Sequence, residues 1–221
     1  MKRTLIIGSS GGIGAALVLA AQAHGSEVVT LSRREDGFDL RDPQSVKTHL
    51  ERDLGEFDTI LLATGALEID GAVPEKTIRA VTQDAMMAQF ALNAVGPALV
   101  LAYAGRLLPK GRRAVIGTLS ARVGSIGDNA IGGWISYRSA KAALNQIIHT
   151  AAIELSRSHP HSICVALHPG TVQTPFTAKY VGRHPAVSAQ DAAHNLLNVV
   201  DGLAPTDTGN FFDWAGKPVP W

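Results

Sequence analysis

The sequence predicts an α/β fold in which helices cover both faces of one doubly wound parallel sheet. Short apolar runs alternate with longer segments of helical spacing, which is the pattern of successive βαβ units. A glycine-rich turn follows the first apolar run, and no linker, internal repeat or low-complexity tract divides the series. These observations predict a single Rossmann-type domain over residues 1–221.

The first half of the chain supplies three strands and two helices. Residues 5–7 are apolar and predict a strand, and the helical pattern at residues 13–24 ends at Gly25. Residues 27–31 predict a second strand. Residues 43–52 begin with a proline and predict a helix, and residues 58–62 predict a third strand.

The second half continues the alternation. A long Ala- and Leu-rich stretch at about residues 82–108 predicts a helix, and Pro109 and Gly111 mark its end. The elements predicted after it are strands at residues 114–118, 161–167 and 209–212, and helices at residues 136–158 and 189–200.

Composition limits the classes of partner. An apolar fraction of 46% with 18% charged residues provides enough material for a buried core. The 20 Lys and Arg residues nearly balance 19 Asp and Glu residues, so a net charge of +1 leaves no basic footprint for nucleic acid. The apolar stretch at residues 4–7 is too short for a signal peptide or a membrane span. We therefore expect a cytoplasmic protein with no nucleic-acid or membrane partner.

The glycine-rich turn has the spacing G-x-x-x-G-x-G and lies between the first strand and the first helix. Its members are Gly8, Ser10, Gly12, Ile13 and Gly14. Glycines let the backbone turn tightly and approach a pyrophosphate, which free N–H groups and the positive end of the helix hold. Such turns also arise as plain structural punctuation, but this position favours dinucleotide binding.

The end of the second strand predicts the cofactor. An NAD-selective site usually presents an acidic residue here, whereas this chain has Ser32 and Arg33. A guanidinium matches a 2′-phosphate with a permanent, forked positive charge, which favours NADP(H) over NAD(H). Glu35 and Asp36 follow and would weaken the local potential, and the alternative is a solvated basic loop.

A serine, a tyrosine and a lysine carry the predicted chemistry. Ser120 follows a strand, and Tyr137 precedes Lys141 by four positions at the start of a helix. Residues four apart share a helix face, so the ammonium is predicted to favour the phenolate and lower its pKa from about 10 towards neutrality. The alternative is an aromatic residue and a lysine on an ordinary amphipathic helix.

These motifs together resemble the classical short-chain dehydrogenase/reductase family over nearly the whole chain. The motifs in the family's order are the glycine turn ending at Gly14, Ala63-Thr64-Gly65, Asn93, Ser120, Tyr137 with Lys141, and His168-Pro169-Gly170 with Thr174. Residues 120–134, residues 209–214 and the final Pro220-Trp221 resemble the C-factor-like branch. That branch includes carbonyl reductases and proteins discussed as signals.

The resemblance implies a role for each motif. Tyr137 would be the general acid/base, Ser120 would hydrogen-bond the substrate oxygen, and Lys141 would lower the tyrosine pKa and hold the nicotinamide ribose. Asn93 would support a water path to Lys141.

The resemblance also implies three groups of cofactor contacts. Asp39 and Leu40 would flank the adenine, and Ala63, Thr64 and Gly65 the adenosine ribose. The residues that would border the nicotinamide are Pro169, Gly170, Val172 and Thr174.

The chain departs from the family pattern at three places. Ile7 replaces a threonine before the first glycine, and Ala63-Thr64 replaces Asn-Ala. Tyr137 lies 17 positions after Ser120, a longer spacing than usual, which leaves Ser125 as a rival for the serine role.

The predicted function is NADPH-dependent reduction of a small ketone, aldehyde or quinone-like compound. Specificity would come from residues 128–134 and a short substrate loop at about 174–188, where Trp134, Phe176 and Tyr180 offer an apolar wall. The alternative is a dinucleotide-binding regulator or signalling protein with little turnover.

The remaining expectations concern metal, thiol and assembly. The histidine spacing does not promise convergent ligands, so we expect no metal site. Cys164, flanked by Ile163 and Val165, is expected to be a buried strand residue. The helices at 82–108 and 136–158 carry more Ala and Leu than one core face requires, and the family resemblance implies a homodimer or homotetramer.

Overall fold

A computed structural model of the chain describes residues 1–175, 177–180 and 186–221. Within these residues, six parallel strands form one sheet in the order β2-β1-β3-β4-β5-β6. The strands are β1 (Arg3–Ile7), β2 (Glu27–Leu31), β3 (Thr59–Leu62), β4 (Ala114–Leu119), β5 (Ser162–His168) and β6 (Phe211–Asp213). The predicted doubly wound parallel sheet is confirmed.

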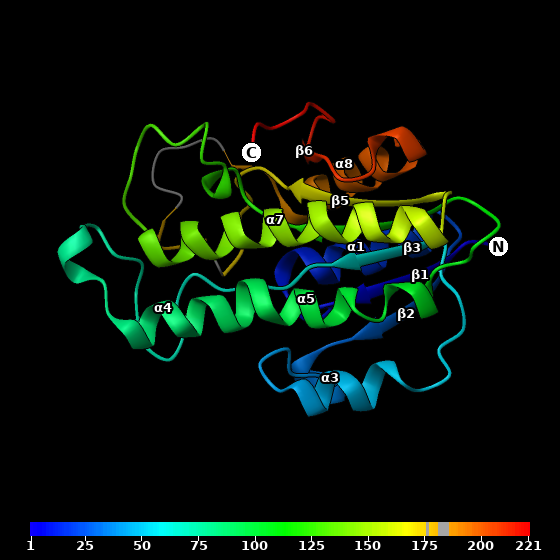
Figure 1. The fold of residues 1–221 in the computed structure, drawn as a ribbon, viewed down its shortest axis with the longest axis horizontal. Helices are drawn as coiled ribbons and strands as arrows, with labels where there is room; N and C mark the ends of the chain where they lie inside the picture. The colour runs from blue at the N-terminus through cyan, green and yellow to red at the C-terminus, as the bar shows by residue number, and fades with distance from the viewer. Residues whose placement is uncertain (176, 181–185) are drawn as a thin grey trace.

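Helices cover both faces of the sheet (Figure 1). They are α1 (Gly12–Ala23), α2 (Arg33–Asp36), α3 (Pro43–Leu50), α4 (Gln83–Phe90), α5 (Gly96–Leu101), α6 (Ala104–Leu107), α7 (Ile135–Ser158) and α8 (Ala189–Gly202). A π-helical turn, η2 (Ala91–Val95), joins α4 to α5, and 3-10 turns lie at η1 (Ile78–Ala80), η3 (Arg122–Gly124) and η4 (Pro205–Asp207).

Two apolar layers hold the helices to the sheet. Leu5, Ile7 and Ile116 pack with α3, α5 and α7 on one face, while Ile6 and Val115 pack with α1 and α8 on the other. Both faces are therefore buried, as the near-continuous apolar runs of parallel strands require. Cys164 is fully buried in β5, which confirms its predicted position.

The strand order positions a ligand site. β1 pairs with β2 on one side and with β3 on the other, so the chain changes winding direction between β1 and β3. In open α/β sheets, ligands bind outside the carboxyl ends of the strands at this switch point. The glycine turn follows β1 and residues 63–65 follow β3, so both motifs lie there.

The predicted helix at 82–108 is broken in the structure. The proline at Pro97 has no N–H to donate to the carbonyl of Asn93, four residues earlier, and its ring crowds that carbonyl. The π-helical turn at η2 accommodates this conflict. After α5 the chain turns near Tyr103 before α6, so the long stretch is several shorter elements rather than one helix.

Two further differences between the predicted and the observed elements have local causes. The short helix α2 was not predicted, because Ser32 supplies a local N-cap in a polar segment that lacks apolar periodicity. β6 begins at Phe211 rather than at residue 209, since Gly209 has a φ of +82° and its N–H turns to the carbonyl of Cys164.

One helical stretch in the described residues, Gln83–Leu101, is long and apolar enough to cross a membrane by length and composition alone. Within it, 39% of the residues are buried inside the protein. Core helices of globular proteins meet the same criterion, and Figure 1 shows α4 and α5 running beside α7.

Candidate active site

The glycine turn forms a tight cradle between β1 and α1. Gly8 has a φ of +91°, and its N–H donates to the carbonyl of Leu31 at 2.7 Å. A Cβ atom at Gly14 would overlap the carbonyl oxygen of Gly8, so no larger residue fits. α1 has no side-chain N-cap, which leaves its first amides for a ligand.

Two further observations fit a dinucleotide in this cradle. The buried Ser9 hydroxyl has no hydrogen-bond partner within the described residues. A Cβ at Gly12 would lie 2.7 Å from Thr174 Cγ2, so Thr174 borders the turn from the opposite side. The backbone of residues 8–14 would hold the pyrophosphate, with Thr174 beside it.

The end of β2 separates the roles of its two predicted cofactor residues. Ser32 is buried, its Oγ accepts from the N–H of Glu35 at 3.1 Å, and its own N–H donates to Asp36 at 2.7 Å. Ser32 therefore caps α2, whereas Arg33 is exposed to solvent. The carboxylate of Asp36 is turned into this cap, which reduces its opposition to an anion near Arg33.

The predicted adenine-flanking pair has one buried member. Leu40 is buried in the core, and the Asp39 carboxylate accepts from the N–H of Arg41 at 2.9 Å. The Asp39 N–H donates to Ser45 Oγ at 3.0 Å. The connection from β2 to α3 is therefore held by local hydrogen bonds.

Gly65 is the meeting point of the loop after β3 with α7. Its φ is +142°, and a Cβ there would lie 2.7 Å from Asn93 Oδ1 and 3.6 Å from Lys141 Nζ. The N–H of Ala63 donates to the carbonyl of Ile7, which ties this loop to the end of β1. Residues 63–65 thus lie between the glycine turn and the catalytic candidates.

Asn93, in the π-helical turn, holds the loop after β3 by hydrogen bonds. Its side chain accepts from the N–H of Ala66 at 3.2 Å and donates to the Ala66 carbonyl at 3.0 Å. It also donates to Gln89 Oε1 at 2.6 Å, and Gln89 donates to the carbonyl of Leu67. Gln89 was not predicted, although its spacing of four from Asn93 on a helix was a usable signal.

The tyrosine and the lysine lie where the spacing predicts. Both are buried near the start of α7, with Lys141 Nζ 5.9 Å from the centroid of the Tyr137 ring. Lys141 Nζ donates to the carbonyl of Leu119, the last residue of β4, at 2.9 Å. This hydrogen bond brings the first turns of α7 to the carboxyl end of β4.

Ser120 joins this group through a residue that sequence reasoning missed. Its hydroxyl donates to Asn145 Oδ1 at 2.6 Å, and Asn145 Nδ2 donates to the carbonyl of Gly124 at 3.3 Å. Tyr137, Lys141 and Asn145 are successively four apart, so they share one face of α7. That periodicity could have identified Asn145.

The rival serine has a different position. Ser125 lies beyond η3, and its hydroxyl accepts from the N–H of Asp128 at 3.1 Å. Both serines are buried, but Ser125 holds the loop that follows η3, whereas Ser120 directly follows β4 and contacts Asn145.

Burial controls the protonation of the site. It raises the pKa of the Tyr137 phenol well above its ordinary value and lowers the pKa of Lys141 to about 7. The sequence predicted the opposite direction for Tyr137, through the charge of Lys141. That prediction was wrong for this structure, because removal from water disfavours both the phenolate and the ammonium.

The start of α7 is held by a distant carboxylate. Trp134 occupies the N-cap position with a φ of +52° and makes no side-chain cap. Instead the buried Glu75 accepts from the Ser136 hydroxyl and, at 3.3 Å, from the Ser136 N–H. Because Glu75 lies 61 positions earlier, no local pattern could have identified this cap.

Aromatic side chains border the tyrosine. The Trp134 ring lies edge-on to Tyr137, with 6.4 Å between centroids, and to Tyr180 at 5.4 Å. The Tyr180 hydroxyl donates to Glu68 at 2.7 Å, and Lys179 pairs with the same carboxylate. Two of the three predicted wall residues are therefore in contact, while Phe176 lies outside the described residues, as do residues 181–185.

The segment after β5 supplies the remaining predicted site residues at the carboxyl ends of the strands. Pro169 and Gly170 follow β5, Val172 is buried, and the Thr174 hydroxyl lies 3.3 Å from Thr177 Oγ1. Burial lowers the pKa of His168 to about 4. Within residues 1–175, 177–180 and 186–221, no group of three His, Cys, Asp or Glu side chains has the geometry to hold a metal ion.

Comparison with known proteins identifies the class of this arrangement. Residues 7–210 match the family described as Enoyl-(Acyl carrier protein) reductase. Since the match spans most of the chain, the protein belongs to this family of short-chain dehydrogenases/reductases.

Individual relatives agree with this class. C-signal of Myxococcus xanthus is 36% identical over 137 residues, which cover 62% of this chain and 78% of that protein. The 1-hydroxy-2-glutathionyl-2-methyl-3-butene dehydrogenase of Rhodococcus sp. (strain AD45) is 27% identical over 237 residues and covers 100% of both chains. NADPH-bound carbonyl reductase from chicken fatty liver shares the fold, with a TM-score of 0.81 at 22% identity over 100% of this chain and 94% of that one. The protein is therefore a dinucleotide-dependent oxidoreductase.

Proposed function

We propose that this protein is an NADP(H)-dependent carbonyl reductase in which Tyr137 is the general acid. One observation carries the proposal: Tyr137, Lys141 and Asn145 share a face of α7, and hydrogen bonds join this face to the end of β4, from Lys141 to Leu119 and from Ser120 to Asn145. This group lies beside the glycine cradle at the switch point of the sheet. A small ketone or aldehyde placed between the two would contact a proton donor and a hydride donor together.

Tyr137 holds the proton that the reaction needs. Because burial raises its pKa, the phenol stays protonated near neutral pH. Bound NADPH would supply the hydride to the carbonyl carbon, which is the cofactor's own chemistry. Tyr137 donates its proton to the carbonyl oxygen as negative charge develops there, and the product is an alcohol.

Ser120 and Lys141 support this transfer. The Ser120 hydroxyl, which donates to Asn145 in the structure, turns towards the substrate oxygen and stabilises its developing charge. Lys141, with a pKa lowered to about 7, exchanges protons near neutral pH and returns one to Tyr137. The Asn93 carbonyl, which Pro97 cannot bond, supports a water on that route.

The preference for NADP(H) rests on the end of β2. Arg33 is exposed there, and Asp36 is engaged by the N–H of Ser32. The chicken carbonyl reductase with the same fold holds NADPH. A guanidinium at this position attracts a 2′-phosphate, which NADH lacks.

The test is oxidation of NADPH and NADH by the purified protein with a panel of small aldehydes, ketones and quinones. We expect turnover with NADPH, and a loss of roughly 100-fold or more in Tyr137→Phe with NADPH binding retained. Tyr103→Phe, which removes a hydroxyl away from the site, is the matched control. Normal turnover by Tyr137→Phe would overturn the assignment of the acid.

A second candidate is a dinucleotide-binding signalling protein with little turnover. The observation that favours it is the 36% identity to C-signal. Tight NADPH binding without turnover on any panel member would support this candidate over the reductase.

We also propose that the chain forms a homodimer or homotetramer in the cytoplasm. Apolar side chains on the outer surface of α4, η2 and α7 are exposed, with 62% exposure at Met87 and 49% at both Val95 and Ile153. Burying them against a second copy would remove apolar surface from water. Light scattering after gel filtration measures the number of subunits, and a monomer would contradict this proposal.

A further inference from the structure

A tight hairpin follows β3 and presents one carboxylate. Ile69 and Ala72 form an antiparallel bridge, with the Ala72 N–H donating to the Ile69 carbonyl at 2.9 Å. Between them, Asp70 and Gly71 have φ values of +52° and +82°. Two consecutive left-handed residues form the type I′ turn in which Asp-Gly is favoured. The turn therefore holds Asp70 in a defined place.

The guanidinium of Arg41, which lies on the other side of the switch point, binds this carboxylate. Arg41 Nη1 donates to Asp70 Oδ1 at 2.9 Å, and Arg41 Nη2 donates to Asp70 Oδ2 at 2.8 Å. This forked geometry is the one by which arginine binds phosphate. Arg41 directly follows Leu40, so it lies in the connection predicted to flank the adenosine.

A second guanidinium acts on the same carboxylate. The hydrogen bond from Arg41 lowers the pKa of Asp70 below its ordinary value, and the charge of Arg33 lowers it further. Arg33 and Arg41 both belong to the connection between β2 and α3. The N–H of Phe38 donates to the carbonyl of Ser32 at 3.1 Å, so this connection folds back towards the end of β2, where Arg33 lies. Arg41, three positions after Phe38, is therefore on the same side of the sheet as Arg33.

We propose that Arg41 binds the 2′-phosphate of NADP(H) together with Arg33, and that Asp70 competes with this phosphate for Arg41. The inference rests on the proposed function, because it requires an adenosine 2′-phosphate at the end of β2. A phosphate monoester carries about −1.5 to −2 charge at neutral pH, more than a carboxylate. Side-chain exposures of 35% for Arg41 and 60% for Asp70 give water, and hence an incoming anion, access to the pair.

A purely structural role for the Arg41–Asp70 pair predicts a different effect on ligand affinity. If the Arg41–Asp70 pair only bridges two loops over the adenosine, breaking it weakens ligands with and without a 2′-phosphate equally. If Asp70 competes with the phosphate, only the phosphorylated ligand changes. The ratio of the two affinities therefore distinguishes these roles.

The experiment is calorimetric titration of the full chain with 2′,5′-ADP and with 5′-ADP. Both ligands lack nicotinamide, so the measurement does not depend on turnover. We expect Asp70→Asn to raise the preference for 2′,5′-ADP roughly three- to tenfold, and Arg41→Ala to lower it about tenfold. Asp70→Asn keeps an Asn-Gly type I′ turn, so the hairpin is retained.

Asp53→Asn is the matched control, because it removes the same charge from the chain between α3 and β3, at the opposite edge of the sheet. Its affinity ratio should equal that of the wild type. If the wild type prefers 2′,5′-ADP but both site variants keep its ratio, the inference fails and the NADP(H) proposal stands. If the wild type binds the two ligands equally, the NADP(H) preference and the inference fail together.

Discussion

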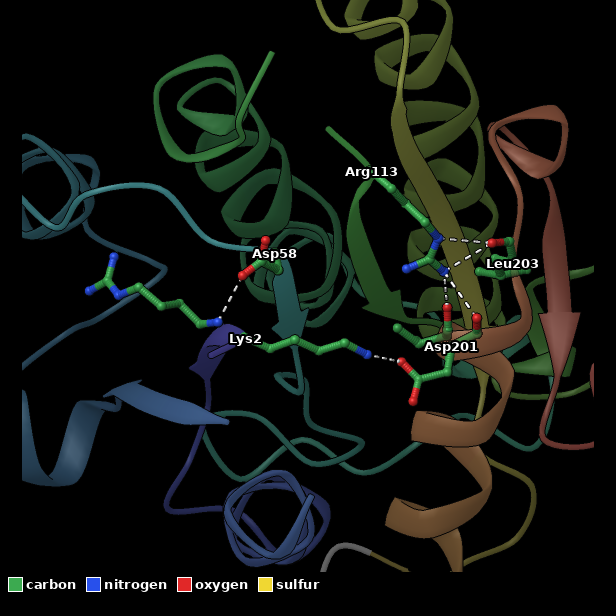
Figure 2. Close-up of polar contacts among 7 residues, drawn as sticks. Lys2, Asp58, Arg113, Asp201 and Leu203 are labelled. Atoms are coloured by element: carbon green, nitrogen blue, oxygen red, sulfur yellow. Dashed lines mark hydrogen bonds and ion pairs between the residues drawn. The ribbon is translucent and has the colours of Figure 1, made fainter. Parts of the chain in front are cut away.

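The amino-terminal and the carboxyl-terminal ends of the parallel strands are surrounded by different interactions. At the amino-terminal ends of the strands, Figure 2 shows Lys2 paired with Asp201. The Lys2 ammonium lies 2.8 Å from the Asp201 carboxylate. It also shows Arg113 directed at the end of α8, where its guanidinium donates to the carbonyls of Val200 and Leu203. These contacts satisfy charges and the last carbonyls of a helix, which stabilises the fold.

At the carboxyl-terminal ends of the strands, some charged and polar groups of the described residues lack a partner, and the backbone is strained at one position. Lys141 is buried with no ion pair among the described residues, and Trp134 holds a left-handed backbone conformation. Of the four buried polar side-chain atoms without a partner in the described residues, three lie on this side, in Ser9, Thr118 and His168; the fourth is in His159.

The amino-terminal ends of the strands therefore stabilise the fold, whereas the carboxyl-terminal ends retain polar groups that the described residues do not satisfy. Unpaired donors, strained backbone and a buried lysine persist only if the surrounding fold holds them in place. Such features gather at functional sites, where a ligand completes them. The following predictions test that contrast, beginning with the largest effect.

Lys141→Met should affect activity most. We expect turnover to fall by roughly 100-fold or more, because the site loses the group that exchanges protons with Tyr137. NADPH oxidation measures this loss. Turnover within a factor of about two of the wild type would remove Lys141 from the proposed mechanism.

The same variant should also change the pH dependence of stability. The pKa of Lys141 is about 7 when folded and near 10.5 ordinarily, so between these values the unfolded chain binds more protons. Wild-type stability should therefore rise with pH across this window, by about 1 kcal/mol per pH unit relative to Lys141→Met, and be lost as pH falls towards 7. Urea unfolding from pH 7 to 10 measures the difference, and parallel profiles would contradict the prediction.

Asn145→Ala should lower the turnover number about tenfold or more, because Ser120 loses the partner that positions its hydroxyl. The affinity for NADPH should stay unchanged, which separates positioning from cofactor binding. Gln146→Ala, the exposed neighbour on α7, is the control. Equal turnover numbers in the two variants would show that Ser120 needs no positioning.

Arg113→Ala should affect stability rather than catalysis. Loss of the hydrogen bonds to Val200 and Leu203 should cost about 1–3 kcal/mol in the free energy of unfolding, with turnover unchanged. Arg113→Lys keeps the charge but not the fork, so an intermediate cost is expected. Chemical denaturation gives the free energies. A loss of activity without a loss of stability would break the contrast between the two ends of the strands.

Lys2→Ala should have the smallest effect. Both members of the Lys2–Asp201 pair are exposed, so its removal should cost less than about 1 kcal/mol. The cost should shrink at high salt, because ions screen exposed charges. Thermal unfolding at low and high ionic strength is the measurement, and a salt-independent loss of several kcal/mol would be inconsistent with a surface pair.

Local patterns were sufficient for most of the fold. The strand at residues 27–31 was predicted with its observed bounds, because a short run rich in β-branched residues is a local signal. The helix over 82–108 failed, since composition does not show how Pro97 disturbs the carbonyl of Asn93. The predicted direction of the Tyr137 pKa shift was also wrong, because burial depends on how the whole site packs.

The doubly wound sheet, the glycine turn and the spacing of Tyr137 and Lys141 could be predicted from the sequence alone, because the patterns that indicate them are formed by residues close together in the chain. Three contacts became apparent only in the folded structure: Glu75 caps α7, Asn145 accepts from Ser120, and Asp70 pairs with Arg41. These contacts join residues 61, 25 and 29 positions apart. Their partners become neighbours only after the parallel sheet brings the carboxyl ends of its strands to one edge.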